Sequence, residues 1–398
     1  MGEQQQQHHQ HKNDQDDNDE IKEEEKVTNV TTLDYELINV ADEANRQYPK
    51  WLSILYIMVI YSLYLTASML PIVLLLLFIG LWYNVVPSFV IILIVTVISI
   101  DYIIPLGIRS KPNRQTSFRH FKLGAEGIAN YHSARSICLC QKELSKVENK
   151  YKSYILASWP HGLMGGGSHG GLIDFFECGS NEFQPIYSAA SVLKYVPVVR
   201  RLHAMWGICD VTKSELTRIL KHQESTIIHL VVGGIEEMFY TTTTTSGTGS
   251  NHHNFEQIVI NKRKGFIKLA IECGIDIIPH YTFGANETYT RYFNHNSLFA
   301  KLSHTLRTSL IFWTGRWYIP FGYIPKNVPL LSVAGNIFHV PKVSSKDEIT
   351  KELIEETHAK FCQTLRELFN TYKIVYVQEM NASKEWLTKE LLFEDDVY

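Results

Sequence analysis

Several residue patterns are missing from this 398-residue sequence, and each absence excludes a class of protein. The net charge is only -3 and the basic residues form no long stripe, so the sequence shows no nucleic-acid footprint. The amino-terminal segment lacks the basic start and short apolar core of a cleaved secretory signal. The six cysteines show neither the paired spacing of a zinc site nor the density of a disulfide scaffold. We therefore expect a protein that binds no nucleic acid and whose folded part lies in a reducing environment.

Charged residues are absent from the stretch between Trp51 and Ile100, which contains no Asp, Glu, Lys, Arg or His. One bilayer crossing needs about 20 apolar residues, so this stretch is long enough for two helices. The segment from Asn84 to Ser88 offers a turn between them, because it combines an asparagine with a proline. Basic residues flank both ends, and the positive-inside tendency therefore places both flanks in the cytosol. We predict a transmembrane helical hairpin over residues 46–110, with a buried helical hairpin of a soluble protein as the alternative.

Composition divides the rest of the chain into a tail and one large domain. Residues 1–45 hold a Gln/His run and then an Asp/Asn/Glu/Lys run, which predict a disordered polar tail rather than a metal site. Residues 111–398 are predicted to form a folded domain, because a chain that is 45% hydrophobic can bury a large core. The basic residues at both ends of the hairpin predict that this domain faces the cytosol. Within that domain, the low-complexity stretch 241–254 predicts a flexible loop.

Short apolar runs alternate with amphipathic stretches in this domain, which is typical of an α/β fold. Strands are predicted where the runs are short and apolar: Tyr154 to Trp159, Ile227 to Val232, Ile275 to His280 and Val333 to Val340. Helices are predicted where the stretches are amphipathic: Ser188 to His203, Lys213 to His222, Lys264 to Cys273 and Asp347 to Tyr372.

The first motif that could carry chemistry is Trp159-Pro160-His161-Gly162, at the end of a predicted strand. Imidazole accepts and returns a proton at neutral pH, as acyl transfer to a hydroxyl requires. The glycine amides that follow could stabilise the oxyanion formed in such a transfer. His161 is therefore a candidate general base, with a structural histidine in a turn as the alternative.

Two further motifs follow apolar strands, and with the first they resemble a known family. One is Val232-Gly233-Gly234-Ile235-Glu236-Glu237; the other runs from Asn261-Lys262-Arg263-Lys264-Gly265-Phe266 to Phe283-Gly284-Ala285-Asn286-Glu287-Thr288-Tyr289. Together these stretches resemble the type-2 diacylglycerol acyltransferase family, which also contains monoacylglycerol and wax-alcohol acyltransferases. The resemblance covers nearly everything from the hairpin to about Lys342.

The resemblance implies a fold and an activity. The fold is an α/β acyltransferase domain anchored by the N-terminal transmembrane hairpin. The activity is esterification of diacylglycerol to triacylglycerol, or of a closely related lipid alcohol, with an acyl group from acyl-CoA as co-substrate and without a metal or other cofactor. The implied location is the endoplasmic reticulum membrane, as a multi-pass protein in contact with membrane lipids, with lipid droplets as a second location. A homo-oligomer is compatible with this picture.

The resemblance also implies roles for individual residues. His161 matches the second histidine of the family's His-Pro-His-Gly motif, and Glu237 matches the acid of its Val-Gly-Gly-x-x-Glu motif. Both are expected to be catalytic, with Glu237 orienting or tuning the imidazole. The residues expected to bind substrate share positions in or beside these motifs: Gly162, Arg200, Gly233, Gly234, Arg263, Lys264, Asn286 and Glu287.

Some of these assignments have alternatives. Lys262, Arg263 and Lys264 are expected to pair with CoA phosphates, although a solvated helix start explains basic residues at such a place nearly as well. Asn286 and Glu287 are expected to hydrogen-bond within the site, with a turn cap as the rival role. Trp159 replaces the family's first motif histidine and cannot accept a proton. We expect catalysis by His161 with altered substrate choice, and a catalytically silent member is the alternative.

Other readings of the motifs remain open. Gly166-Gly167-Ser168-His169-Gly170 fits the nucleophile elbow of a serine lipase or esterase, although glycines rather than a strand precede Ser168. His169 and Asp174 show the spacing of glycerophosphate-type acyltransferases. A non-catalytic lipid-droplet or membrane scaffold is a further alternative, against which the base and acid at strand ends argue.

Overall fold

The structure is a computed structural model, and it describes residues 35–39, 48–83, 87–103, 123–124, 126–146, 148, 152–163, 183–197, 199–222, 225–240, 255–306 and 310–396. Most of the predicted tail and the low-complexity stretch 241–254 lie outside the described residues. Ser168, His169 and Asp174 also lie outside them, so the structure does not test the hydrolase and glycerophosphate-type alternatives.

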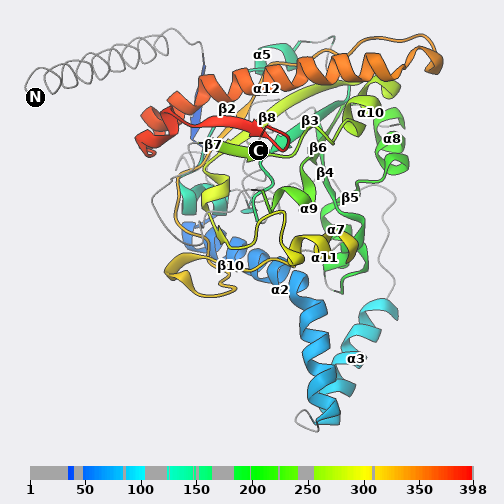
Figure 1. The fold of residues 1–398 in the computed structure, drawn as a ribbon, viewed down its shortest axis with the longest axis vertical. Helices are drawn as coiled ribbons and strands as arrows, with labels where there is room; N and C mark the ends of the chain where they lie inside the picture. Colours follow the sequence, from blue (N-terminus) through cyan, green and yellow to red (C-terminus); the bar gives the residue numbers. More distant parts are fainter. Residues whose placement is uncertain are drawn as a thin grey trace, which may run out of the picture.

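An eight-stranded sheet forms the centre of the described part of the chain (Figure 1). Its strands lie side by side in the order β1 (Leu37–Asn39), β2 (Arg135–Cys138), β11 (Leu331–Ala334), β8 (Asp276–Phe283), β3 (Tyr154–Trp159), β6 (Thr226–Val231), β4 (Gln184–Ala189) and β5 (Cys209–Asp210). The strands from β8 to β5 run parallel, whereas β11 is antiparallel to β8 and β1 is antiparallel to β2. The carboxyl ends of β8, β3 and β6 therefore meet at one edge of the sheet.

Helices cover one face of this sheet and bury its apolar side chains. These helices are α8 (Lys213–His222), α10 (Gly265–Cys273) and α12 (Lys351–Met380), and α12 lies along one side of the molecule in Figure 1. The Thr350 side chain accepts the Leu353 N–H and starts α12, and Asn381 ends the helix in a left-handed conformation. The buried stripe of α12 includes Phe361, Leu365 and Phe369, which pack against the strands at helical spacing.

Shorter elements surround this core. The α-helices are α5 (Gln141–Leu144), α7 (Val199–Trp206), α9 (Gly234–Glu237) and α11 (Leu298–Leu306). The 3-10 helices are η3 (Ser191–Tyr195), η4 (Ala285–Glu287), η5 (Arg316–Tyr318), η6 (Lys346–Glu348) and η7 (Lys384–Leu387). Two strand pairs lie outside the main sheet: β9 (Thr290–Arg291) with β10 (Trp313–Thr314), and β7 (Phe255–Ile258) with β12 (Glu390–Phe393).

The charge-free stretch forms two consecutive helices, α2 (Lys50–Trp82) and α3 (Ser88–Ile103), which extend away from the sheet (Figure 1). The predicted helices are present, and the interval between them, residues 83–87, overlaps the turn predicted from Asn84 to Ser88. In the described part of the chain, no helix meets the combined requirements of length and apolar character for crossing a membrane. The transmembrane hairpin over residues 46–110 is thus not confirmed, and it stays a prediction.

Both helices are attached to the domain by polar contacts. At the start of α2, the Ser53 hydroxyl accepts a hydrogen bond from the Asn130 amide at 3.2 Å. At the end of α3, the Asp101 carboxylate pairs with Arg200 at 3.0 Å and also with Arg201, both on α7. The ends of α2 and α3 that lie nearer the sheet are therefore held by the domain.

The predicted elements agree with the structure where the pattern is local. The predicted ranges of β3 and α8 are confirmed, and β6, β8 and α10 begin within a residue of their predicted starts. The strand predicted from Val333 to Val340 is wrong beyond Ala334, because regular pairing stops there; only an isolated bridge between Phe338 and Ile277 continues the contact with β8. A Cβ at Gly335 would come within 2.6 Å of the Leu368 side chain.

Other boundaries also differ from the prediction. The helix predicted from Asp347 to Tyr372 begins at Lys351 and extends to Met380, and Asp347 lies in the separate 3-10 helix η6. The helix predicted from Ser188 is wrong at its start, since Ser188 and Ala189 end β4, and the remainder is divided between η3 and α7. The prediction of a disordered polar tail over residues 1–45 is wrong for Leu37–Asn39. These residues form β1, which pairs with β2.

Candidate active site

Three turns converge at the carboxyl edge of the sheet, and each carries one of the motifs. His161 follows β3, Glu237 follows β6, and Asn286 follows β8. Since β8, β3 and β6 are parallel neighbours, the topology brings these turns together although they are far apart in sequence. A ligand site at this edge is typical of open α/β sheets.

Glu237 links the first two motifs through the backbone. Its carboxylate is almost fully buried, and one oxygen accepts the backbone N–H of His161 at 2.5 Å. The other oxygen accepts the backbone N–H of Val259 at 3.2 Å. Among the described residues, the Glu237 carboxylate thus contacts the backbone of His161 and of Val259. Its expected role in orienting or tuning the imidazole stays a prediction.

The environment of Glu237 favours the protonated carboxyl. Burial raises its pKa to about 7, although the two backbone N–H donors and the positive charge of Arg291 act in the opposite direction. The Glu237 carboxyl therefore changes charge near neutral pH. Gly233 leaves the space that this side chain occupies, because a Cβ there would lie 1.7 Å from a Glu237 carboxylate oxygen.

The His161 ring is oriented by its own turn. Its Nδ1 lies 2.8 Å from the Gly162 carbonyl oxygen, which can only accept a hydrogen bond. In the neutral ring Nδ1 is then the donor, and the lone pair that can accept a proton is on Nε2. The following residue, Gly162, has a φ of +60° and approaches the Ala285 carbonyl, so the first motif packs directly against the third. This tautomer makes Nε2 the nitrogen that could act as a general base.

Trp159 is a core residue rather than a member of the site. Its side chain is fully buried and packs edge-on against Phe266 and at a tilt against Phe361. The indole N–H donates to the Val259 carbonyl at 3.3 Å. Val259 thus binds Trp159 through its carbonyl and Glu237 through its N–H, so the tryptophan supports the segment that holds the buried acid.

A buried polar network extends from the third motif. The Asn286 amide donates to Glu256 at 2.7 Å, and its oxygen accepts from Arg291 at 3.2 Å. Burial lowers the pKa of Arg291 to about 10, while the negative charges of Glu256 and Glu237 act to raise it. Arg291 is therefore a buried cation that lies near the carboxylates of the site.

Sequence reasoning missed Glu256 and Arg291. Arg291 lies in a run of aromatic residues, Tyr289 to Phe293, and a charged residue in such an apolar setting is a signal of a buried ion pair. Glu256 offers no comparable signal. Its importance depends on hydrogen-bond partners that are 25 or more residues away in sequence.

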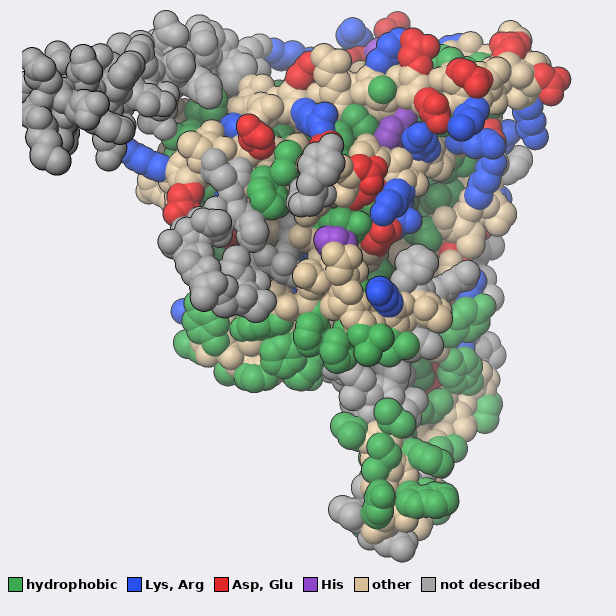
Figure 2. Space-filling model, in the orientation of Figure 1, with side chains coloured by type: hydrophobic (Ala, Val, Ile, Leu, Met, Phe, Trp, Pro, Cys, Tyr) green, Lys and Arg blue, Asp and Glu red, His purple; other side chains and the backbone are tan. Residues whose placement is uncertain are grey.

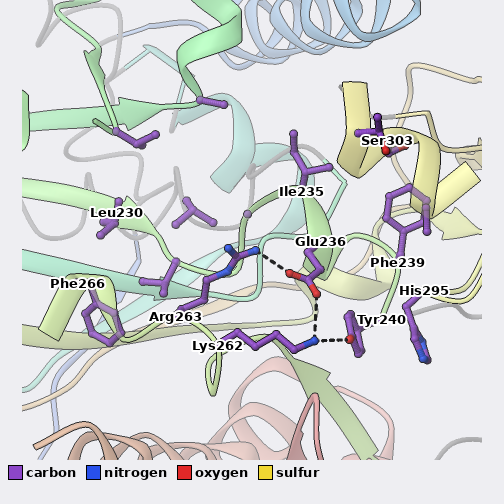
Figure 3. Close-up of a pocket in the computed structure, with 18 of the residues that line it drawn as sticks. Leu230, Ile235, Glu236, Phe239, Tyr240, Lys262, Arg263, Phe266, His295 and Ser303 are labelled. Atoms are coloured by element: carbon purple, nitrogen blue, oxygen red, sulfur yellow. Dashed lines mark hydrogen bonds and ion pairs between the residues drawn. The ribbon is translucent and has the colours of Figure 1, made fainter. Parts of the chain in front are cut away.

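A cavity of about 1080 Å³ adjoins the second motif. Figure 3 shows Leu230, Ile235, Phe239 and Phe266 around it, with Lys262 and Arg263 directed at Glu236. Arg263 lies 2.9 Å from one Glu236 oxygen and Lys262 lies 3.3 Å from the other. His295 and Lys301 also line the cavity, which therefore combines an apolar wall with a basic rim.

The remaining substrate-binding candidates have different surroundings. Gly234 lines the cavity with a φ of +64°, and the Gly233 carbonyl accepts from Arg263 at 3.2 Å. Lys264 points instead towards Glu355 on α12, at 3.3 Å. Glu287 pairs with Lys389 at 3.0 Å.

Arg200 is not brought to these motifs by any contact. It pairs with Asp101, and its guanidinium lies over the Tyr102 ring at 4.3 Å. Its role in substrate binding stays a prediction.

No group of three or more His, Cys, Asp or Glu residues within the described ranges is placed to hold a metal ion.

Comparison with known proteins identifies the family of this chain. A family model described as diacylglycerol acyltransferase matches residues 83–384. The chain is 27% identical over 244 residues to diacylglycerol O-acyltransferase 2-like protein 6 of Bos taurus, covering 56% of this chain and 67% of that protein. It is 26% identical over 246 residues to acyl-CoA wax alcohol acyltransferase 1 of Mus musculus, covering 59% and 70%. It is 30% identical over 236 residues to diacylglycerol O-acyltransferase 2 of Dictyostelium discoideum, covering 56% and 66%.

Among solved structures, the crystal structure of the 1-acyl-sn-glycerophosphate acyltransferase PlsC from Thermotoga maritima matches 80% of this chain and 97% of that chain. The identity is 12% and the TM-score is 0.33, too low to support an argument. The resemblance predicted from the three motifs is confirmed by the family model and by the relatives. The chain belongs to the diacylglycerol acyltransferase family.

Proposed function

We propose that this protein is an acyl-CoA-dependent O-acyltransferase that esterifies diacylglycerol, or a closely related lipid alcohol, in neutral-lipid synthesis. The observation that carries the proposal is the His161 ring, whose Nδ1 donates to the Gly162 carbonyl and leaves the basic lone pair on Nε2. The names of the relatives support both a diacylglycerol and a wax-alcohol acceptor.

The chemistry follows from the position of that lone pair. His161 Nε2 takes the proton of the acceptor hydroxyl as the oxygen attacks the thioester carbonyl. Backbone N–H groups near Gly162 stabilise the negative charge that develops on the carbonyl oxygen. When the carbon–sulfur bond breaks, the CoA sulfur leaves and takes the proton back from Nε2. The transfer is a single displacement without an acyl-enzyme.

The cavity supplies the features that acyl-CoA needs. Its apolar wall, which includes Leu230 and Phe239, suits a fatty acyl chain. Lys262 and Arg263 on its rim suit the CoA phosphates. Both cations pair with Glu236 in this structure, so phosphate binding involves an exchange of partners.

An exposed apolar surface supports association with lipid. Figure 2 shows apolar side chains gathered along the lower margin of the domain and over the helices below it. The exposed residues include Leu298 on α11, and Trp317 and Tyr318 in η5. Aromatic side chains of this kind are typical of membrane interfaces. We place the protein on the endoplasmic reticulum membrane, and on lipid droplets, through this surface and through α2 and α3.

The test is acyl transfer by membranes that contain the protein, with labelled oleoyl-CoA and with diacylglycerol, monoacylglycerol or fatty alcohol offered separately. Transfer to one acceptor, lost in His161→Ala, supports the proposal and identifies the acceptor class. Activity that survives His161→Ala but is lost in Ser168→Ala would identify a serine hydrolase. No transfer to any acceptor would favour a non-catalytic scaffold.

A further inference from the structure

The segment after η7 lies beyond the residues that the family model matches, which end at 384. This segment contains β12, which pairs in parallel with β7 so that Phe393 lies opposite Ile258. Leu391 and Phe393 are buried in the main apolar core. The next residue after β7 is Val259, whose N–H is bound by Glu237. The strand β12 is therefore connected to Glu237, the buried acid of the site, through β7 and the adjoining residue Val259.

Glu394 binds three consecutive backbone N–H groups. One carboxylate oxygen accepts from Ile260 at 2.7 Å and from Asn261 at 3.1 Å, and the other accepts from Lys262 at 2.8 Å. The carboxylate is nearly buried. This turn connects β7 to α10 and carries Lys262 and Arg263, which line the cavity. A charged acceptor for three N–H groups is a strong constraint on the path of the turn.

Lys389 binds the acidic side of the polar network. Its ammonium group lies 3.2 Å from Glu256 and 3.0 Å from Glu287, and 3.8 Å from the centre of the Trp386 ring. Trp386 is itself buried, and its indole N–H donates to Glu287 at 3.0 Å. Lys389 thus joins the carboxylate that binds Asn286 to the turn that follows β8.

We propose that Glu394 and Lys389 are positioning residues of the active site, and that Glu394 sets the turn that presents Lys262 and Arg263 to CoA phosphates. Lys389, in the same segment, holds the carboxylates around Asn286. The inference rests on the proposed function for the identity of the ligand. A strand that only completed the core would need neither the carboxylate of Glu394 nor the ammonium of Lys389.

The test separates positioning from stability. Glu394→Gln keeps the side-chain size but offers one good acceptor oxygen where the carboxylate offers two, so at least one backbone N–H of the turn loses its partner. We expect the KM for acyl-CoA to rise about tenfold with kcat changed less than about twofold. Binding of coenzyme A alone to the purified full chain in detergent should weaken by a similar factor. Glu390→Gln is the matched control, because it removes an exposed carboxylate from the same strand and should change neither quantity.

A second pair of variants tests the role of Lys389, and a third substitution replaces Glu394→Gln if that variant does not fold. Lys389→Met should lower kcat, and Lys389→Arg should restore it, since arginine supplies a cation to both carboxylates. If Glu394→Gln does not fold, Glu394→Asp, which keeps the charge but is shorter, takes its place with the same expected direction. Loss of activity in proportion to the folded fraction, with unchanged KM and coenzyme A affinity, would overturn the inference. If the wild type transfers no acyl group, the proposed function fails, whereas coenzyme A binding still decides the inference.

Discussion

The substitution Glu237→Gln tests the central contact of the site. Glutamine has the shape of glutamate, but only its oxygen accepts hydrogen bonds, so its NH2 group must face one of the two N–H donors. Either His161 or Val259 then has a buried N–H without an acceptor, which costs about 1–3 kcal/mol of folding free energy. We expect kcat/KM to fall about 100-fold, because a small displacement of His161 misdirects the proton transfer.

The same variant has a pH signature. The unfolded carboxyl ionises near pH 4.5, whereas burial holds its pKa in the folded chain at about 7. Between these values the folded protein binds more protons at this site, so wild-type stability falls as pH rises, by about 1.4 kcal/mol per pH unit. The stabilisation is complete below pH 4.5 and lost above pH 7. Glutamine does not titrate, so the stability penalty of Glu237→Gln should shrink by about 2–3 kcal/mol between pH 5 and pH 8.

The assay is unfolding of the detergent-solubilised wild type and variant at both pH values, together with acyl transfer at pH 7. Glu390→Gln changes an exposed glutamate and should show neither effect. A stability penalty that is the same at pH 5 and pH 8 would refute the account of Glu237 as a buried carboxyl whose pKa is raised to about 7. Wild-type activity in Glu237→Gln would refute its role in holding His161.

Other substitutions test the surroundings of the site. Gly233→Ala places a Cβ onto the buried carboxylate and should abolish acyl transfer. Gly124→Ala is the control: its Cβ would make only an ordinary 3.5 Å contact with Tyr56, and Gly124 does not line the cavity, so activity should be unchanged in the same assay. Arg200→Ala should lower the melting temperature without changing the KM for acyl-CoA, because Arg200 pairs with Asp101 on α3. A raised KM would instead support a role of Arg200 in substrate binding. Trp159→Phe should cost about 1 kcal/mol in unfolding measurements, because one buried hydrogen bond is lost, with kcat nearly unchanged. A large loss of kcat in Trp159→Phe would contradict a purely supporting role.

The fold was predictable from sequence where each element depends on its own residues. The run from Tyr154 to Trp159 is apolar throughout and fully buried, so its strand was found with the right ends. Short strands such as β7 and β12 were missed, because what stabilises them is mainly the partner strand more than 130 residues away. Their sequences alone show neither a long apolar run nor a turn that would reveal the pairing.

The candidate site was likewise predictable only where its residues belong to a local sequence motif. Motif residues such as His161 and Glu237 were found because each lies shortly after a recognisable strand and close to a glycine in sequence. The way in which these two residues contact each other could not be predicted. An acid can bind either the ring or the backbone of a histidine, and only the packing of α9 decides between them. Lys389 and Glu394 were missed because nothing near them in sequence identifies their partners.

The pairing of Glu236 with both Lys262 and Arg263 bears on which anions compete for the cavity. A chloride ion or a single inorganic phosphate would have to displace a carboxylate that is already held by two cations. A ligand with several phosphate groups and an acyl chain has more interactions to offset that loss. The internal counter-ion therefore makes the cavity tolerant of cellular salt, and binding there should depend less steeply on ionic strength than two unpaired cations would predict.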